Sequence, residues 1–511
     1  MKTKATALTP VFPLLLLKLA LHLFTNTNYG FHRDEYLYLV EGQHLSWGYM
    51  EIPPLTAFLA YLANGLGVSV FVVRLFPALI GVLSVYLLCR LVLSLGGQKW
   101  SVIFVGLAFI FSPVYLASNT LFQPVSFNQF FWLLTAYCLV KLVQTQNKHF
   151  WWAIGLSLAL GFLTKHSIAF YALALILAFV WSEHRHWLAT PYPYAAAVLA
   201  FLLVSPHLHW QYVHGFPVWQ HMEELSRTQL SNVNLSDFLA SQLLAHHLWG
   251  GLWLLGLWAL FTQARWKPYR FLGIALLLTV TIIAYFGGKN YYPRGAYTIL
   301  FAFGALALEA QLKSFRRKWL LLAVCIALTL PLLPYALPIL PVAQMEDYCA
   351  MMRHHLGYSA PLRWEDGQYY DLPQDIADMH GWEELAQKVA QLYHQLDSVE
   401  QQTCMIYGGG YAHASVLNFY RDQYQLPATF SVNSSYVMWV KKDQVFDRQI
   451  LVDDVRQSNS SWFANMELVD QIEHPHAREP GYIYYRTQPK INLYEAWNNF
   501  VEEERQQFYL E

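Results

Sequence analysis

The sequence predicts a polytopic α-helical membrane protein with about 11 spans, followed by a smaller α/β domain. Of the 511 residues, 55% are hydrophobic and only 13% are charged, whereas about a quarter of a soluble domain is charged. Apolar blocks near the ~20 residues needed to cross a bilayer recur between residues 11 and 341. The 33 basic and 34 acidic residues nearly balance, so nothing suggests a nucleic-acid partner.

Each apolar block is expected to be a helix, because backbone polar groups in lipid must be satisfied within the segment. The shorter block 55–67 is expected to be a juxtamembrane helix lying at the interface. The first block follows Lys2 and Lys4 but lacks a small-residue cleavage site, so we expect an uncleaved first helix. The expected spans are 8–28, 70–95, 101–118, 124–143, 150–164, 167–182, 194–210, 238–261, 271–287, 295–311 and 319–340.

Basic residues gather in alternate loops between these spans, which predicts an orientation. By the positive-inside rule the basic loops are cytoplasmic. The loops expected to face outward are 29–69, 119–123, the turn at 165, 211–237, 288–294 and everything after 341. The sequence therefore predicts a transmembrane domain over 1–341, with the outward loop 29–69, and an outward-facing α/β domain over 342–511.

The expected outward domain shows local patterns of both helix and strand. Residues 381–396 and 410–423 are helix-like, and residues 403–409 and 449–455 are strand-like. Glycines 408–410 between a strand and a helix are compatible with phosphate binding, although a steric need at the turn is the commoner reason. Cys349 and Cys404 are compatible either with a disulfide or with free thiols.

The acidic pair Asp34 and Glu35 follows the first expected span. A carboxylate beside basic groups at the outer membrane surface can act as a general base on a hydroxyl acceptor. The alternative interpretation is a solvated loop pair or an acid that stabilises a helix N-terminus.

Basic residues at the ends of spans on the same outward side can hold a phosphate and neutralise charge on a leaving group. They are Lys165, Lys289 and Arg294. Snorkelling to lipid headgroups is the alternative for each. The nearby aromatic residues Tyr291 and Tyr292 suit sugar stacking or anchoring at the interface.

Several segments together carry a family resemblance. They are HRDEYLYLVEGQHLSWGYMEIPPL (32–55), FQPVSFNQFFWLL (122–134), LTKHS (163–167), HGFPVWQ (214–220), GGKNYYPRGAYTILFAFGALALE (287–309) and LPQDIADMHGWEELAQKVAQLY (372–393). In this order they resemble the bacterial protein-mannosyltransferase-like glycosyltransferases, family 39 of the GT-C superfold, which include the lipid A aminoarabinose transferases.

The resemblance implies an inverting glycosyltransferase with a polyprenyl-phosphate sugar as donor and a hydroxyl of a glycolipid, cell-surface glycan or protein as acceptor. It also implies the bacterial inner membrane, with the reaction and the C-terminal domain on the periplasmic side. Asp34 takes the position of the catalytic base and Glu35 that of its acidic partner. The expected donor-phosphate contacts are Lys165, Lys289, Arg294 and Arg33, and the weaker acceptor or sugar contacts are Tyr291, Tyr292, Gln123, Asn128 and Glu51.

Two departures from the family pattern matter. Gln123 and Asn128 stand where relatives often carry an Asp, so the sequence does not support a divalent-metal site, although it does not exclude one. The lipid-activated donor needs no nucleotide cofactor. Ile52 stands where aminoarabinose transferases tend to have Lys before the proline pair, which argues against that particular activity. The alternative function is a transporter or flippase of a polyprenyl-linked sugar, but paired broken helices and an internal repeat are not evident. A third candidate function, an O-acyltransferase, is not supported, because no histidine of this sequence stands in a context typical of that class of enzyme.

Overall fold

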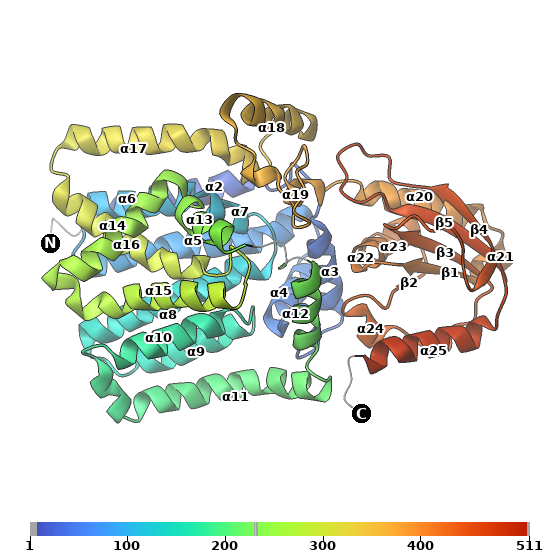
Figure 1. Cartoon of the computed structure of the whole chain (residues 1–511), viewed down its shortest axis with the longest axis horizontal. Coiled ribbons are helices and arrows are strands. Elements are labelled where there is room, and N and C mark those ends of the chain that lie inside the picture. Colours follow the sequence, from blue (N-terminus) through green and yellow to red (C-terminus); the bar gives the residue numbers. More distant parts are fainter. Residues whose placement is uncertain (1–7, 229, 231–233, 508–511) are drawn as a thin grey trace. The chain divides into compact units, whose positions relative to one another are not determined.

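The computed structural model describes residues 8–228, 230 and 234–507 and divides into two compact units (Figure 1). The first unit comprises residues 1–28, 71–208 and 225–339, and the second comprises residues 29–70, 209–224 and 340–511. The expected domain boundary near 341 is close to the last of these divisions. Residues 29–70, which we assigned to the transmembrane domain, pack instead with the C-terminal segment. Lys2 and Lys4 lie outside the described residues.

The first unit is helical, and a helix lies in every expected span. Its elements are α2 (Val11–Leu23), α5 (Val70–Ser94), α6 (Lys99–Phe111), α7 (Pro113–Ser118), α8 (Pro124–Thr145), α9 (Phe150–Phe162), α10 (Ile168–Val180), η1 (Arg185–Ala189), α11 (Tyr192–Val213), α12 (Pro217–Thr228), α13 (Leu235–Leu244), η3 (His247–Trp249), α14 (Gly250–Thr262), η4 (Ala264–Tyr269), α15 (Arg270–Tyr285), α16 (Arg294–Gln311), α17 (Phe315–Thr329) and η5 (Leu330–Tyr335). The unit divisions fall within α11 and α12.

Three expected spans are interrupted, each for a local reason. The span 101–118 breaks between α6 and α7 at Pro113, which has no N–H to continue the helical hydrogen bonds. The span 238–261 bends by 83° between α13 and η3, where His247 has a φ of 48°. The span 319–340 ends in the 3₁₀ helix η5, which contains Pro334.

Among the described residues, four helical segments are long and apolar enough to cross a membrane. They are Val70–Ser94, Pro124–Thr145, Ala264–Tyr285 and Phe315–Tyr335. The bent pair of α13 with η3 and α14 would make a fifth, and α2, α6, α9 and α10 are shorter apolar helices. By length and composition the structure therefore supports a membrane protein, with fewer qualifying helices than the 11 expected spans.

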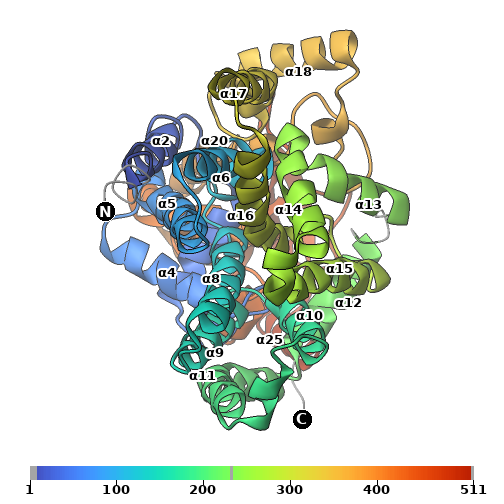
Figure 2. The same cartoon turned by 90° about the vertical axis from the view of Figure 1, so that its left-hand side faces the viewer.

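Helix α16 is the core of the first unit, where it packs against α6, α8, α14 and α15 (Figure 2). The approach to α14 is unusually close. A Cβ on Gly304 would lie 1.8 Å from the Leu252 carbonyl oxygen, and one on Gly256 would lie 2.1 Å from that of Leu300. Small residues permit such contacts between apolar helices, where dispersion rather than water expulsion holds helices together. The N-terminus of α16 is thereby fixed among its neighbours.

The second unit contains a five-stranded mixed sheet with helices. Its strands, in the order β2–β1–β3–β5–β4, are parallel from β2 to β3 and antiparallel from β3 to β4. The strands are β1 (Cys404–Gly408), β2 (Thr429–Phe430), β3 (Arg448–Asp453), β4 (Phe463–Asp470) and β5 (Tyr482–Pro489). The helices are α3 (Arg33–Gln43), α4 (Pro54–Gly65), α18 (Val342–Leu356), η6 (Ala360–Leu362), α19 (Gln374–Ala377), α20 (Trp382–Gln395), α21 (Ser398–Gln402), α22 (Tyr411–Phe419), α23 (Arg421–Tyr424), α24 (Tyr436–Trp439) and α25 (Leu493–Gln506).

The expected strands and helices of this unit are present, and α4 coincides with the expected helix 55–67. Register pairs such as Ile406 with Ile450 place buried β-branched residues at the centre of the sheet. Helix α3 joins this unit because Leu37 and Val40 pack against Ala414 of α22. All five cysteines are buried and none forms a disulfide, Cys349 and Cys404 included.

Candidate functional site

The acidic pair Asp34 and Glu35 lies in the first turn of helix α3. The His32 imidazole accepts the Asp34 N–H at 3.1 Å, and Glu35 Oε2 accepts the His32 N–H at 2.8 Å. This reciprocal arrangement is a capping box. Glu35 is fully buried, so its contacts are those of a helix cap, whereas the Asp34 side chain keeps 27% of its surface exposed. Of the two acids, Asp34 is the one that a substrate can reach.

Arg33 is held by carboxylates. Its guanidinium pairs with Glu479 and lies 3.7 Å from Asp378 Oδ1 and 3.8 Å from Asp34 Oδ1. Burial alone would raise the pKa of Asp378, but His32, Arg33 and Arg478 outweigh it and hold that pKa at about 2. Arg33 was expected to contact a donor phosphate. Its three carboxylate neighbours favour instead a role in fixing the start of α3.

The C-terminal segment contacts Asp34 directly. Tyr411, the first residue of α22, donates its hydroxyl to Asp34 Oδ1 at 2.8 Å. The Arg33 guanidinium lies 5.4 Å from the centre of the Tyr411 ring. No local sequence pattern indicates this contact, since 377 positions separate the two residues.

A second pair of carboxylates, Glu41 and Glu51, lies further along the segment 29–70 that contains Asp34. Ser435 Oγ is 2.5 Å from Glu51 Oε2 and 3.2 Å from Glu41 Oε1, and it accepts the Met50 N–H. One hydroxyl carries one hydrogen, so both carboxyl contacts are satisfied only when one acid is protonated. Burial and the neighbouring Glu51 raise the pKa of Glu41 well above its usual value. Glu51, expected as a substrate contact, is therefore engaged within the protein.

In the first unit, three predicted phosphate contacts converge on one aromatic ring. Lys165 Nζ, Lys289 Nζ and the Arg294 guanidinium lie 5.7, 5.9 and 5.9 Å from the centre of the Tyr291 ring. Lys165 also lies 5.2 Å from the Tyr292 ring. Lys165 lies in the turn before α10, Lys289 and the two tyrosines lie in the turn before α16, and Arg294 is the first residue of α16. The cations thus gather at the end of α16 where the helix dipole is positive, an arrangement that attracts anions.

Asn128 positions one of these cations. Its side-chain nitrogen donates to the carbonyls of Gly161 and Lys165 at 2.8 and 3.1 Å. Its oxygen accepts from Trp132 Nε1 at 2.7 Å and from Ser167 Oγ at 3.2 Å. The amide is 4% exposed and all of these partners belong to the protein. Asn128 was expected as a substrate contact, but its bonds hold the turn that carries Lys165.

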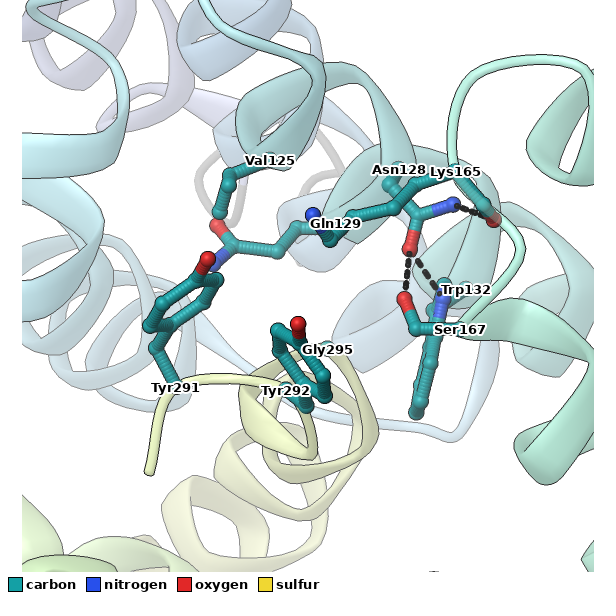
Figure 3. Close-up of a pocket in the computed structure, with 9 residues that line it drawn as sticks. All are labelled: Val125, Asn128, Gln129, Trp132, Lys165, Ser167, Tyr291, Tyr292 and Gly295. Atoms are coloured by element: carbon teal, nitrogen blue, oxygen red, sulfur yellow. Dashed lines mark hydrogen bonds between the residues drawn. The ribbon is translucent and has the colours of Figure 1, made fainter. Parts of the chain in front are cut away.

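A pocket of about 220 Å³ lies at the cation cluster (Figure 3). Gln129 lines it, and its Nε2 is a buried donor without a hydrogen-bond partner among the described residues. The lining residues are Val125, Asn128, Gln129, Trp132, Lys165, Ser167, Tyr291, Tyr292 and Gly295.

Sequence reasoning missed Gln129, although a signal was present. Positions 125, 128, 129 and 132 have the i, i+3, i+4, i+7 spacing of one helix face, and this face of α8 lines the pocket. Gln123 lies at the N-cap of α8, where its backbone carbonyl accepts the Ser126 hydroxyl. The predicted residues therefore fall into two groups, one in each unit.

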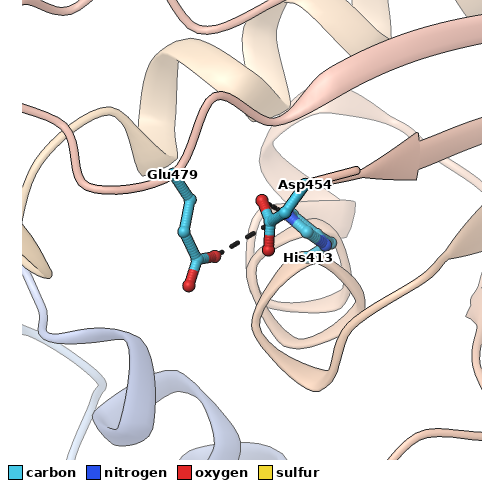
Figure 4. Close-up of side chains that lie close together, drawn as sticks. All are labelled: His413, Asp454 and Glu479. Atoms are coloured by element: carbon cyan, nitrogen blue, oxygen red, sulfur yellow. Dashed lines mark hydrogen bonds and ion pairs between the residues drawn. The ribbon is translucent and has the colours of Figure 1, made fainter. Parts of the chain in front are cut away.

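A third cluster, of His413, Asp454 and Glu479, has ligand atoms within 4.8 Å of one another (Figure 4). The His413 Nδ1 accepts the Gly410 N–H at 3.3 Å, and its Nε2 lies 2.9 Å from Asp454 Oδ1. A neutral imidazole that accepts at Nδ1 carries its proton at Nε2, the nitrogen that would have to bind an ion. Metal-bound histidines donate from the other nitrogen instead, so these contacts favour a hydrogen-bonded cluster over a metal site.

The glycines at 408–410 do not form a phosphate cradle. The Gly409 and Gly410 N–H groups donate to the Val452 carbonyl and to His413, and the Tyr411 N–H donates to Asn433. A Cβ on Gly409 would lie 3.0 Å from the Asp453 carboxyl carbon. The donors are used by the protein and an acid lies beside them, so a steric need explains the glycines.

Comparison with known proteins identifies the class. The structure of ArnT from Cupriavidus metallidurans bound to undecaprenyl phosphate matches with a TM-score of 0.60 and 15% identity, covering 94% of this chain and 98% of that one. The apo state of the same protein matches with a TM-score of 0.60 and 13% identity, covering 93% and 97%. No curated protein sequence gives a significant match. The chain shares the fold of ArnT, which is a GT-C fold, and the resemblance stated from the sequence is confirmed.

Within this class, one family model matches part of the chain. Residues 51–210 match the model of the dolichyl-phosphate-mannose-protein mannosyltransferases. This segment includes α8 and the turn at Lys165, and therefore part of the pocket.

Proposed function

We propose that the protein is an inverting glycosyltransferase that moves a sugar from a polyprenyl-phosphate donor to a hydroxyl acceptor. The acceptor is a glycolipid, a cell-surface glycan or a protein. In the proposed reaction Asp34 takes the proton of the acceptor hydroxyl, whose oxygen bonds to the anomeric carbon. The bond from that carbon to the phosphate oxygen breaks, and polyprenyl phosphate leaves with the electron pair.

The convergence of Lys165, Lys289 and Arg294 at the N-terminus of α16 is the observation that carries this proposal. A lipid-linked phosphate gains negative charge as it leaves, and fixed cations in a site of low dielectric stabilise that charge. Undecaprenyl phosphate is bound by ArnT, whose fold this chain shares. The Gln129 donor, which lines the same pocket as Lys165, supports the same assignment.

Asp34 is the base of the proposal because it is the partly exposed member of the acidic pair. The distribution of basic residues over the loops supports eleven spans, with 29–69 and the residues after 341 on the periplasmic side of a bacterial inner membrane. The sugar reaches the enzyme already activated on lipid phosphate, so the proposed reaction uses no nucleotide.

The test uses the full-length protein in membranes with radiolabelled polyprenyl-phosphate sugars. Asp34→Asn should abolish transfer while donor binding persists, because the amide cannot take a proton. Lys165→Gln combined with Arg294→Gln should weaken donor binding. Arg265→Gln, in the loop expected to be cytoplasmic, is the control and should match the wild type. Transfer at the wild-type rate by Asp34→Asn would refute the assignment of the base. If labelled lipid moves between the leaflets without any sugar transfer, the transferase proposal is refuted and the flippase alternative is favoured.

A further inference from the structure

The environment of Tyr411 is built to hold one hydroxyl against Asp34. The Tyr411 backbone N–H donates to Asn433 Oδ1 at 3.0 Å, which fixes the start of α22. The ring packs into the cluster that joins α22 to α3, and the Arg33 guanidinium lies over it. The hydroxyl donates to Asp34 Oδ1 at 2.8 Å. Backbone, ring and hydroxyl are thus each held by a separate contact.

Arg33 connects this arrangement to the rest of the second unit. Its backbone N–H donates to the Asp378 carbonyl at 3.1 Å, and its guanidinium pairs with Glu479. Asp378 also receives Arg478 at 3.0 Å. The ring of Tyr411 therefore lies against a cation that cannot move without breaking several ion pairs. The ion pairs that fix Arg33 therefore also fix the position of the Tyr411 phenol.

The phenol is a donor throughout the physiological range. Burial, with the Asp34 carboxylate beside it, raises the pKa of Tyr411 well above its usual value. A phenol has one proton, and here that proton is directed at Asp34 Oδ1. This contact helps to set the orientation of the carboxylate, whose other charged or titratable neighbours are Arg33, with Nε 3.8 Å from Oδ1, and His32, with Nδ1 3.8 Å from Oδ2.

We propose that Tyr411 is a positioning residue for sugar transfer, which orients the Asp34 carboxylate that receives the acceptor's proton. This inference rests on the proposed function of Asp34. It assigns the C-terminal segment a part in the chemistry: the residues after 340 supply the group that orients the base. The Asp34 side chain reaches its reactive orientation only when α22 is docked on α3.

Loss of the hydroxyl has a defined consequence. A hydrogen bond donated to a carboxylate stabilises its charged form, so Tyr411→Phe shifts the acidic limb of the pH–rate profile to higher pH. Misorientation of the base lowers kcat by about 10- to 100-fold. The apparent KM for the donor stays within about twofold, because the pocket at Lys165 is unaltered. A structural role alone would change thermal stability without moving the profile.

The experiment compares full-length Tyr411→Phe and Tyr420→Phe in membranes across a pH range. Tyr420 is the matched control: it follows the same helix, and its hydroxyl contacts that of Tyr36 at 3.3 Å. The proposal expects the fall in kcat and the shifted acidic limb in Tyr411→Phe alone. A wild-type kcat and profile in Tyr411→Phe would overturn it.

A second readout separates this inference from the proposed function. Carbodiimide labels protonated carboxyl groups, and mass spectrometry measures labelling of Asp34 against pH without any substrate. Tyr411→Phe should extend labelling of Asp34 to higher pH, whether or not Asp34→Asn abolishes transfer. Identical labelling curves for Tyr411→Phe and the wild type would refute the positioning role. Full transfer by Asp34→Asn would refute the base assignment instead.

Discussion

The side chain of Asn128 holds the backbone of Lys165, with its nitrogen 3.1 Å from the Lys165 carbonyl oxygen. The same amide bonds Trp132 and Ser167. One buried residue of α8 thus determines where a cation of the pocket lies, although it has no charge. The position of Lys165 is a property of this hydrogen-bond network.

Replacement of Asn128 by Leu should weaken donor binding. The variant leaves the Gly161 and Lys165 carbonyls and the Trp132 N–H without this partner, and a buried unpaired group costs about 1–3 kcal/mol. We expect the apparent KM for the donor to rise about tenfold, with some loss of thermal stability. Asn147→Ala, in an exposed turn of the same unit, is the control. An unchanged KM would show that the turn holds Lys165 without Asn128.

Gln129→Leu should reduce transfer by removing a donor from the pocket. Gln129 Nε2 is buried and unpartnered among the described residues. The substitution also removes the Oε1 that accepts the Ser118 hydroxyl, but this hydroxyl keeps the Tyr115 carbonyl as a second acceptor. We expect kcat/KM to fall about 10-fold or more, since a hydrogen bond to a charged group contributes about 1.5–3 kcal/mol. Gln129→Glu should lower kcat/KM further, because the charge of the glutamate repels a phosphate.

The matched control for Gln129 is Gln144, near the other end of α8, whose amide donates to the Ser94 carbonyl. Gln144→Leu should lower stability slightly and leave kcat/KM unchanged. Equal kinetic effects at both positions would indicate a general defect of α8 rather than a ligand contact.

Glu41 should make stability depend on pH. Its pKa is raised by burial and by Glu51, so the folded state retains a proton that the unfolded state loses above about pH 4.5. Stability therefore falls as pH rises from about 4.5 toward the raised value, by at most about 1.4 kcal/mol per pH unit. Glu41→Gln carries no such proton, so its thermal stability relative to the wild type should increase steadily from pH 5 to pH 8.

The measurement is the unfolding temperature in detergent at several pH values. Glu504→Gln, a partly buried acid of α25, is the comparison variant and should show a smaller trend. A constant difference between Glu41→Gln and the wild type at every pH would mean that Glu41 is ionised in the folded protein.

Gly304→Ala should destabilise the first unit. The added Cβ would lie 1.8 Å from the Leu252 carbonyl oxygen, so α14 and α16 must separate. Overpacking of this kind costs about 1–3 kcal/mol and should lower the unfolding temperature by several degrees. Gly251→Ala, on α14 with nothing within 4 Å of its Cβ, should be neutral or stabilising. Equal unfolding temperatures for the two variants would contradict the close packing.

The sequence by itself determined the helices of the first unit, because hydrophobicity and backbone satisfaction in lipid are local properties. It also predicted strands β1 and β3 and helix α20 from local patterns. The sequence also predicted that Lys165, Lys289 and Arg294 lie in loops on one side of the membrane, and the structure brings these three residues to one ring. The breaks at Pro113 and His247 escaped prediction, because hydrophobicity continues across them.

Only the tertiary structure decided which residues serve which role. Glu35 is buried as a helix cap and Arg33 is engaged by carboxylates, since α3 packs on α22. Tyr411 reaches Asp34 from 377 positions away, and composition has no means of indicating such a contact. Charge and hydrophobicity are read from neighbours in sequence, whereas a hydrogen bond depends on the positions of two atoms, which the packed fold sets.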